Sequence, residues 1–213
     1  MKRTLWVPVL LMVMLGGCAN PFMKHYQDGS GGLGKQNRAE PAGAGEPKLT
    51  TGTDPDGDAL RMLEDGYTRI GVSYFNAASV DAHGALEQAK AVHADSVIVY
   101  SSKAGERHNY LATYWVKLQP PVFGVHMQDL TTETRILSGT KTGAYVIAVV
   151  KDSPAARAGI VRGDIIRKIG DVDVNGGAVL YDAVMKYAGQ KVMVEIWREH
   201  QAVEKEVQLD RKQ

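Results

Sequence analysis

The pattern of apolar and polar positions separates a nearly unpatterned first quarter of the chain from two patterned segments. In the first patterned segment, residues 67–75 (YTRIGVSYF) are rich in β-branched and aromatic side chains, which is typical of a strand. Apolar residues recur every three or four positions over 81–93, which predicts a helix. Residues 96–101 (SVIVYS) and 110–118 (YLATYWVKL) predict two more strands. We therefore expect a small β-α-β-β domain over residues 59–119.

The second patterned segment follows Pro120-Pro121, a pair that restricts the backbone before it and cannot donate to a sheet. We expect a second domain over residues 121–210. The pattern predicts a helix with one apolar face at 178–188 and the two strands of a closing hairpin at 191–197 and 202–209.

Within this second domain, residues 152–166 (DSPAARAGIVRGDII) predict a tight corner. Ser153 is placed to cap a helix whose first residue is Pro154. The alanines that follow keep this helix thin, so its backbone can lie close to a sheet. Gly159 supplies the left-handed conformation that ends a helix, and Gly163 opens the turn into the next strand.

Residues 18–58 show hardly any apolar periodicity and are rich in Gly, Pro, Asn and Asp. This composition is typical of a flexible linker. A random coil of that length has an end-to-end distance of roughly 35 Å.

Composition and motifs exclude several functional classes. The net charge is +1 and no Lys/Arg run is present, so nothing favours nucleic acid. We expect no cofactor and no metal, because His83, His93 and His108 lack metal-ligand spacing and have no cysteine beside them. No G-x-S-x-G or H-E-x-x-H motif occurs, and we expect a protein that is not an enzyme.

The N-terminus has the pattern of an export signal. Lys2 and Arg3 precede an apolar run over residues 5–15, which is too short to span a bilayer. The run ends in Leu-Gly-Gly-Cys18, which resembles the lipobox of bacterial lipoproteins. The resemblance implies a signal peptide at 1–17 and a diacylglycerol with further acyl chains, such as palmitate, on Cys18. Several acyl chains anchor a protein firmly where one does not.

The residue after Cys18 is alanine. In Gram-negative lipoproteins, an aspartate at this position usually retains the protein at the inner membrane. The resemblance therefore implies a cell-envelope protein, lipid-anchored in the outer membrane and facing the periplasm. The alternative is a plain secretory signal followed by an unpaired cysteine.

The corner motif, D-S-P-A-x-x-A-G-I-x-x-G-D-I-I, strongly resembles that of PDZ domains, in particular those of bacterial HtrA-type proteases and related envelope proteins. The resemblance covers the whole second domain and implies an α+β fold, with a short helix or turn at 131–137 and a strand at 144–150. We expect a C-terminal PDZ-like, partly open β-barrel with two helices, preceded by the small β-α-β-β domain and the disordered linker. HtrA-type proteases carry a trypsin-like domain before the PDZ domain, and residues 59–119 are too few to form one.

PDZ domains bind an extended peptide as an added strand. The resemblance implies that backbone amides at residues 123–125 hold a peptide carboxylate, and that the next two residues offer the pairing edge. The implied peptide-binding residues are Phe123, Gly124, Val125, His126, Met127, Tyr181, Val184 and Met185. Val125, Leu180 and Val184 could equally serve the core alone, and His126 could equally be a surface residue of an edge strand.

These features predict an adaptor or scaffold that binds peptide segments or C-termini of envelope proteins. A first alternative is a structural component of an envelope or secretion complex, whose groove is occupied by its own chain. A second is a regulator of a separate periplasmic protease, which rests on fold analogy alone.

Overall fold

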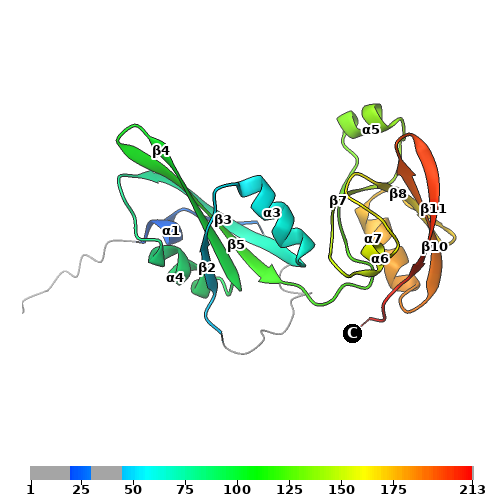
Figure 1. Cartoon of the computed structure of the whole chain (residues 1–213), viewed down its shortest axis with the longest axis horizontal. Coiled ribbons are helices and arrows are strands. Elements are labelled where there is room, and N and C mark those ends of the chain that lie inside the picture. Colours follow the sequence, from blue (N-terminus) through cyan, green and yellow to red (C-terminus); the bar gives the residue numbers. More distant parts are fainter. Residues whose placement is uncertain (1–19, 30–44, 213) are drawn as a thin grey trace, which may run out of the picture.

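The structure is a computed structural model that describes residues 20–29 and 45–212. It contains two domains, each built around its own sheet and joined through residues 118–121 (Figure 1). The predicted signal peptide at 1–17 and the lipid site at Cys18 lie outside the described residues. No helix within the described ranges combines the length and the apolar character needed to cross a bilayer.

The first domain is a five-stranded sheet in the order β1-β3-β5-β4-β2. Its strands are β1 (Tyr26–Asp28), β2 (Lys48–Thr51), β3 (Tyr67–Ala77), β4 (Ser96–Ala104) and β5 (Arg107–Lys117). Helices α1 (Pro21–Lys24) and α4 (His83–Ala91) pack on one face, where the core contains Phe22, Ala89 and Tyr114. Helix α3 (Pro55–Glu64) packs on the other face, over Ile98 and Trp115.

The flexible linker predicted for residues 18–58 does not hold for residues 20–29 and 45–58. Strand β1 pairs antiparallel with β3, and β2 pairs parallel with β4, so both edges of the sheet come from this segment. Phe22 is fully buried, and Asp54 caps α3 by accepting a hydrogen bond from the backbone N–H of Gly57. The two edge strands are short and mostly exposed, and their apolar pattern is correspondingly weak.

The second domain has strand order β11-β10-β8-β7-β6, with β9 paired to β8. Its strands are β6 (Val125–Asp129), β7 (Ala144–Val149), β8 (Ile165–Ile169), β9 (Val172–Asp173), β10 (Lys191–Arg198) and β11 (Gln201–Gln208). Its helices are α5 (Thr132–Ser138), α6 (Pro154–Arg157) and α7 (Gly177–Lys186). The α+β class is confirmed, and α5 occupies the segment predicted as a short helix or a turn.

The predicted corner is confirmed in detail. Ser153 Oγ accepts a hydrogen bond from the backbone N–H of Ala156, and Gly159 has a φ of 73° after the last turn of α6. Asp164 follows the turn and is almost fully buried. Its carboxylate accepts hydrogen bonds from Arg198 Nε at 2.6 Å and from the second guanidinium nitrogen of Arg198 at 2.7 Å, which fastens the corner to the end of β10.

The two domains meet where the C-terminal end of α3 contacts the second sheet. The backbone N–H of Lys151, just after β7, donates to the carbonyl of Glu64 at 2.8 Å. Lys151 Nζ lies 2.6 Å from Asp65 Oδ1. Helix α3 is thus the part of the first domain that is packed against β7 (Figure 1).

Candidate functional site

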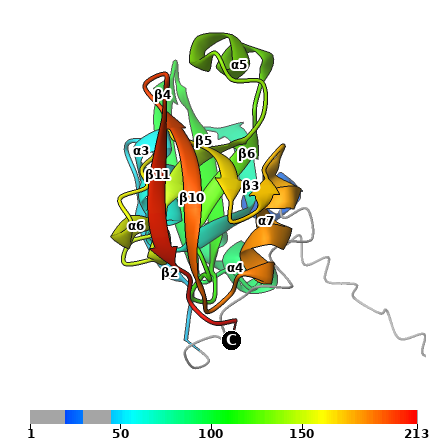
Figure 2. The same ribbon diagram turned by 90° about the vertical axis from the view of Figure 1, so that its right-hand side faces the viewer.

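A groove of about 270 Å³ runs between β6 and α7. Figure 2 shows α7 on one side of the second domain and α6 on the opposite side. The groove is lined mainly by apolar side chains and backbone, contributed by the interdomain segment, the loop before β6, β6 itself, α7 and the C-terminal tail. These residues are Leu118, Gln119, Pro120, Pro121, Val122, Phe123, Gly124, Val125, Met127, Leu180, Tyr181, Val184, Met185 and Lys212.

Strand β6 is an edge strand, and its second edge faces this groove. Gly124 C=O accepts a hydrogen bond from Val150 N–H at 2.9 Å, on the β7 side. Met127 lies opposite Val146, whose N–H and C=O are both bonded to residues 163–164 on the far side of β7. Because backbone groups alternate in direction along a strand, the N–H and C=O groups of Val125 and Met127 point away from β7.

The loop before β6 carries two backbone N–H groups, those of Phe123 and Gly124, for which no hydrogen bond is found among the described residues. The carbonyl of Phe123 accepts from Ala155 N–H at 2.9 Å and the carbonyl of Gly124 accepts from Val150, so both carbonyls are engaged within the domain. Among residues 20–29 and 45–212, no acceptor receives a hydrogen bond from the N–H of Phe123 or Gly124. Both residues are buried, and buried N–H groups are nearly always paired. Adjacent unpaired amides of this kind form an anion-binding nest.

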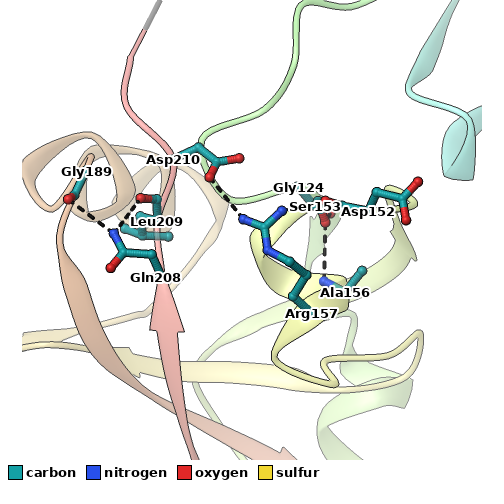
Figure 3. Close-up of polar contacts among 9 residues, drawn as sticks. All are labelled: Gly124, Asp152, Ser153, Ala156, Arg157, Gly189, Gln208, Leu209 and Asp210. Carbon is teal, nitrogen blue, oxygen red and sulfur yellow. Dashed lines mark hydrogen bonds and ion pairs between the residues drawn. The ribbon is translucent and has the colours of Figure 1, made fainter.

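Position 124 requires a glycine, both because of its backbone conformation and because Ser153 lies close to it. Its φ is 93°, which is unfavourable for any residue with a Cβ. A Cβ at this position would overlap the Cβ and Oγ of Ser153, the cap of α6. Figure 3 shows Ser153 directly beside Gly124 while it accepts from Ala156. The corner motif and the loop amides are therefore parts of one packed unit.

Seven of the eight predicted site residues line the groove, and His126 is the exception. Val125 and Met127 are partly buried against the core and also face the groove. On α7, Val184 is 7% exposed and Tyr181 is 49% exposed. Leu180 is fully buried, yet it also lines the groove. These side chains thus pack in the core and line the groove at the same time.

His126 lies on the opposite face of β6, as strand alternation requires. Its Nε2 is 3.1 Å from the carbonyl oxygen of Leu63, at the C-terminal end of α3. Burial lowers the pKa of His126, and the hydrogen bond to Leu63 offsets this only in part. His126 therefore contributes to the contact between the domains, and it is not among the residues that line the groove.

Several groove residues were missed by sequence reasoning. Residues 118–121 also line the groove, although the sequence indicates only a domain boundary at Pro120-Pro121. Lys212 comes from the C-terminal tail, and no local pattern signals its position. At the far end of β6, Asp129 Oδ1 accepts from Gly177 N–H at 2.8 Å and so ties the strand to the start of α7. Within the described part of the chain, no group of three His, Cys, Asp or Glu residues is arranged to hold a metal ion.

The second domain is similar to domains of known proteins. Residues 121–209 match the family described as PDZ domain. Serine protease HTRA1 of Xenopus tropicalis is 29% identical over 89 residues, which cover 38% of this chain and 19% of that protein. The HtrA3 PDZ domain bound to a phage-derived ligand (FGRWV) is 25% identical, with a TM-score of 0.37, over 41% of this chain and 83% of that chain. An HtrA-type protease, AlgW with decapeptide, is 21% identical, with a TM-score of 0.39, over 47% of this chain and 37% of that chain.

Proposed function

Since residues 121–209 are a PDZ domain with homology to the HtrA type, we propose that the groove between β6 and α7 captures an extended peptide as an added strand. The peptide backbone pairs with the outward N–H and C=O groups of Val125 and Met127. Its terminal carboxylate accepts hydrogen bonds from the amides of the loop before β6. The protein then acts as an adaptor or scaffold for its peptide ligands.

One observation carries this proposal. The buried amides of Phe123 and Gly124 have no acceptor among the described residues, and they lie where the unpaired edge of β6 begins. A buried N–H without a partner costs about 1–3 kcal/mol. An acceptor from outside the domain would remove this penalty by forming the missing hydrogen bond. A carboxylate suits this position because it offers several acceptor lone pairs to adjacent donors.

The lining of the groove defines the ligand chemistry further. The side chains of Val125, Leu180 and Val184 offer an apolar surface for the terminal residue of the peptide. Met127 and Met185 lie along the same groove, and methionine adapts its shape to different apolar partners. We expect peptides with an apolar C-terminal residue and broad tolerance of its shape.

The test exploits the direction of the Met127 N–H. A Met127→Pro variant removes a donor that the β6–β7 ladder does not use, and proline is tolerated on an edge strand. Decapeptides ending in apolar residues are screened by fluorescence anisotropy against the wild type, Met127→Pro and Met127→Leu. We expect the Pro variant to lose at least tenfold in affinity, while Leu stays within about threefold. Equal binding by all three proteins would contradict strand addition, provided that circular dichroism shows the variants folded.

The cellular setting is a separate proposal, supported by the apolar run over residues 5–15 and by Cys18. In it, the protein is an outer-membrane lipoprotein whose PDZ domain meets tails or segments of envelope proteins in the periplasm. Mass spectrometry of protein from membranes should find acyl chains on an N-terminal Cys18, and Cys18→Ser should release the protein into the soluble fraction. An unmodified thiol at Cys18 would contradict the anchor.

A second candidate is a structural component of an envelope complex. The contact between His126 of β6 and the end of α3 favours the structural role, because it holds the PDZ domain against the first domain. Within residues 20–29 and 45–212, however, no strand pairs with the groove edge of β6. Crosslinking followed by co-purification separates the candidates: a stable stoichiometric complex that persists in Met127→Pro would favour the structural role.

A further inference from the structure

The C-terminal tail is fixed beside the loop that precedes β6. The backbone N–H of Asp210 donates to the carbonyl of Val122 at 3.0 Å, and its carbonyl accepts from Gly189 N–H at 3.0 Å. The Asp210 carboxylate accepts a hydrogen bond from Arg157 of α6 at 3.0 Å (Figure 3). Asp210 is thereby held on three sides, next to the start of the amide nest at Phe123 and Gly124.

Two residues beyond this anchor, Lys212 lines the groove. It is the one charged residue among the described residues that line it. Lys212 is exposed, and its ammonium has no acidic partner within the described residues. The groove thus combines unpaired backbone amides with a single unpaired positive charge, and both favour a negatively charged group on the ligand.

We propose that Lys212 is a specificity-determining residue that makes the groove prefer a peptide with a free C-terminal carboxylate over an internal peptide segment. This inference rests on the proposed peptide-binding function. An internal segment places a neutral carbonyl at the nest, and this carbonyl gains hydrogen bonds from the amides but little attraction to a nearby charge. The ammonium of Lys212 adds a charge-dependent interaction that only the carboxylate gains.

The neighbouring Arg211 provides a matched control. It carries the same charge and sits in the same tail, but it is not among the residues that line the groove. The aliphatic part of its side chain lies beside Gly189 instead. Replacement of Arg211 therefore changes the net charge of the tail without changing the groove.

The test compares one peptide in two forms. The tightest-binding decapeptide from the anisotropy screen is made as the free acid and as the C-terminal amide. Both are titrated into the full chain as wild type, Lys212→Gln, Lys212→Glu and Arg211→Gln. We expect the wild type to prefer the acid, Lys212→Gln to reduce the acid-to-amide affinity ratio by about three- to tenfold, and Lys212→Glu to reduce it further. The ratio for Arg211→Gln should stay within about twofold of the wild type, and the Lys212 effect should shrink as salt is raised.

The outcomes separate this inference from the function on which it rests. If both peptide forms bind and the ratio is the same in the wild type and Lys212→Gln, the role of Lys212 is overturned and peptide capture stands. If Arg211→Gln lowers the ratio as much as Lys212→Gln, the effect is one of general charge and the specific role is overturned. If neither form binds any variant, peptide capture itself fails, and the role of Lys212 falls with it.

Discussion

The imidazole Nε2 of His126 lies 3.1 Å from the carbonyl oxygen of Leu63, so a residue of the groove strand is bonded to the last turn of a helix in the other domain. The same strand exposes Val125 and Met127 to the groove on its other face. The edge that would receive a peptide is therefore backed by the first domain. The ion pair between Lys151 and Asp65 supports this contact from the adjacent loop.

The contact between the domains should weaken on acidification. Burial lowers the pKa of His126 below its ordinary value of 6.5, so the undocked state binds a proton more readily than the docked state. Stability then rises with pH where the undocked state holds more protons, and the contact loses stability as the pH falls below about 6.5. Lys151 stays charged throughout this range, because its hydrogen bond to Asp65 raises its pKa.

An NMR titration of the His126 ring, together with thermal unfolding between about pH 7.5 and pH 5.5, checks this prediction. The midpoint of the wild type should fall more steeply with acid than that of His126→Gln, whose side chain can still donate to Leu63. A His126 pKa at or above 6.5 would contradict it.

Gly124→Ala should destabilise the PDZ domain by about 2 kcal/mol or more, because the new Cβ adds backbone strain and overlaps Ser153. Gly163→Ala is the matched control: its φ is 96°, but nothing lies within 4 Å of the added Cβ. We expect that variant to lose only about 1 kcal/mol. Urea unfolding compares the two, and similar losses would show that the contact with Ser153 is unimportant.

Asp164→Ala should lower the free energy of unfolding by about 3 kcal/mol, because it removes the buried partner of Arg198. It also removes the acceptor of the Val161 backbone N–H, at 2.9 Å. Glu206→Ala breaks the exposed pair with Lys191 and should cost less than about 1 kcal/mol. Chemical denaturation of both variants measures the difference, which should vanish if the corner is held by apolar packing alone.

Helix α5 should be the least protected helix of the PDZ domain. It has no buried residue, and Ile136 is 75% exposed. The indole N–H of Trp197 donates to the carbonyl of Ser138 at 2.8 Å and holds the end of the helix. Trp197→Phe removes this bond, so amide hydrogen exchange in residues 132–138 should speed up while exchange in α7 stays unchanged. Unaltered exchange in α5 would mean that other contacts hold it.

The features that could be predicted from the sequence are those determined by neighbouring residues. The cap at Ser153, the first helical residue Pro154 and the left-handed Gly159 each follow from chemistry within a few positions, and all three are present. Most of the groove lining was predicted through the resemblance of this corner motif to PDZ domains, which implied a pairing strand with Val125 and Met127 and a facing helix with Tyr181, Val184 and Met185.

The features that were missed depend on contacts between distant parts of the chain. Strand β2 is exposed along its whole length and exists because it pairs with β4, 48 residues away at Lys48 and Ser96. His126 finds its acceptor 63 residues earlier in the chain. Lys212 reaches the groove only because Asp210 is held by Val122, Gly189 and Arg157. No local pattern carries such information.

The first domain begins only a few residues after Cys18. This short separation determines how far an acylated Cys18 would hold the folded protein from the membrane. Helix α1 begins at Pro21, three positions after Cys18, so a fully extended connection spans only about 10 Å. With so short a connection, the folded part of the protein would stay close to the lipid headgroups, and its rotation would be restricted. Ligands would then be sampled from the thin aqueous layer next to the bilayer, and tails projecting from membrane-embedded neighbours would have the advantage over proteins diffusing freely.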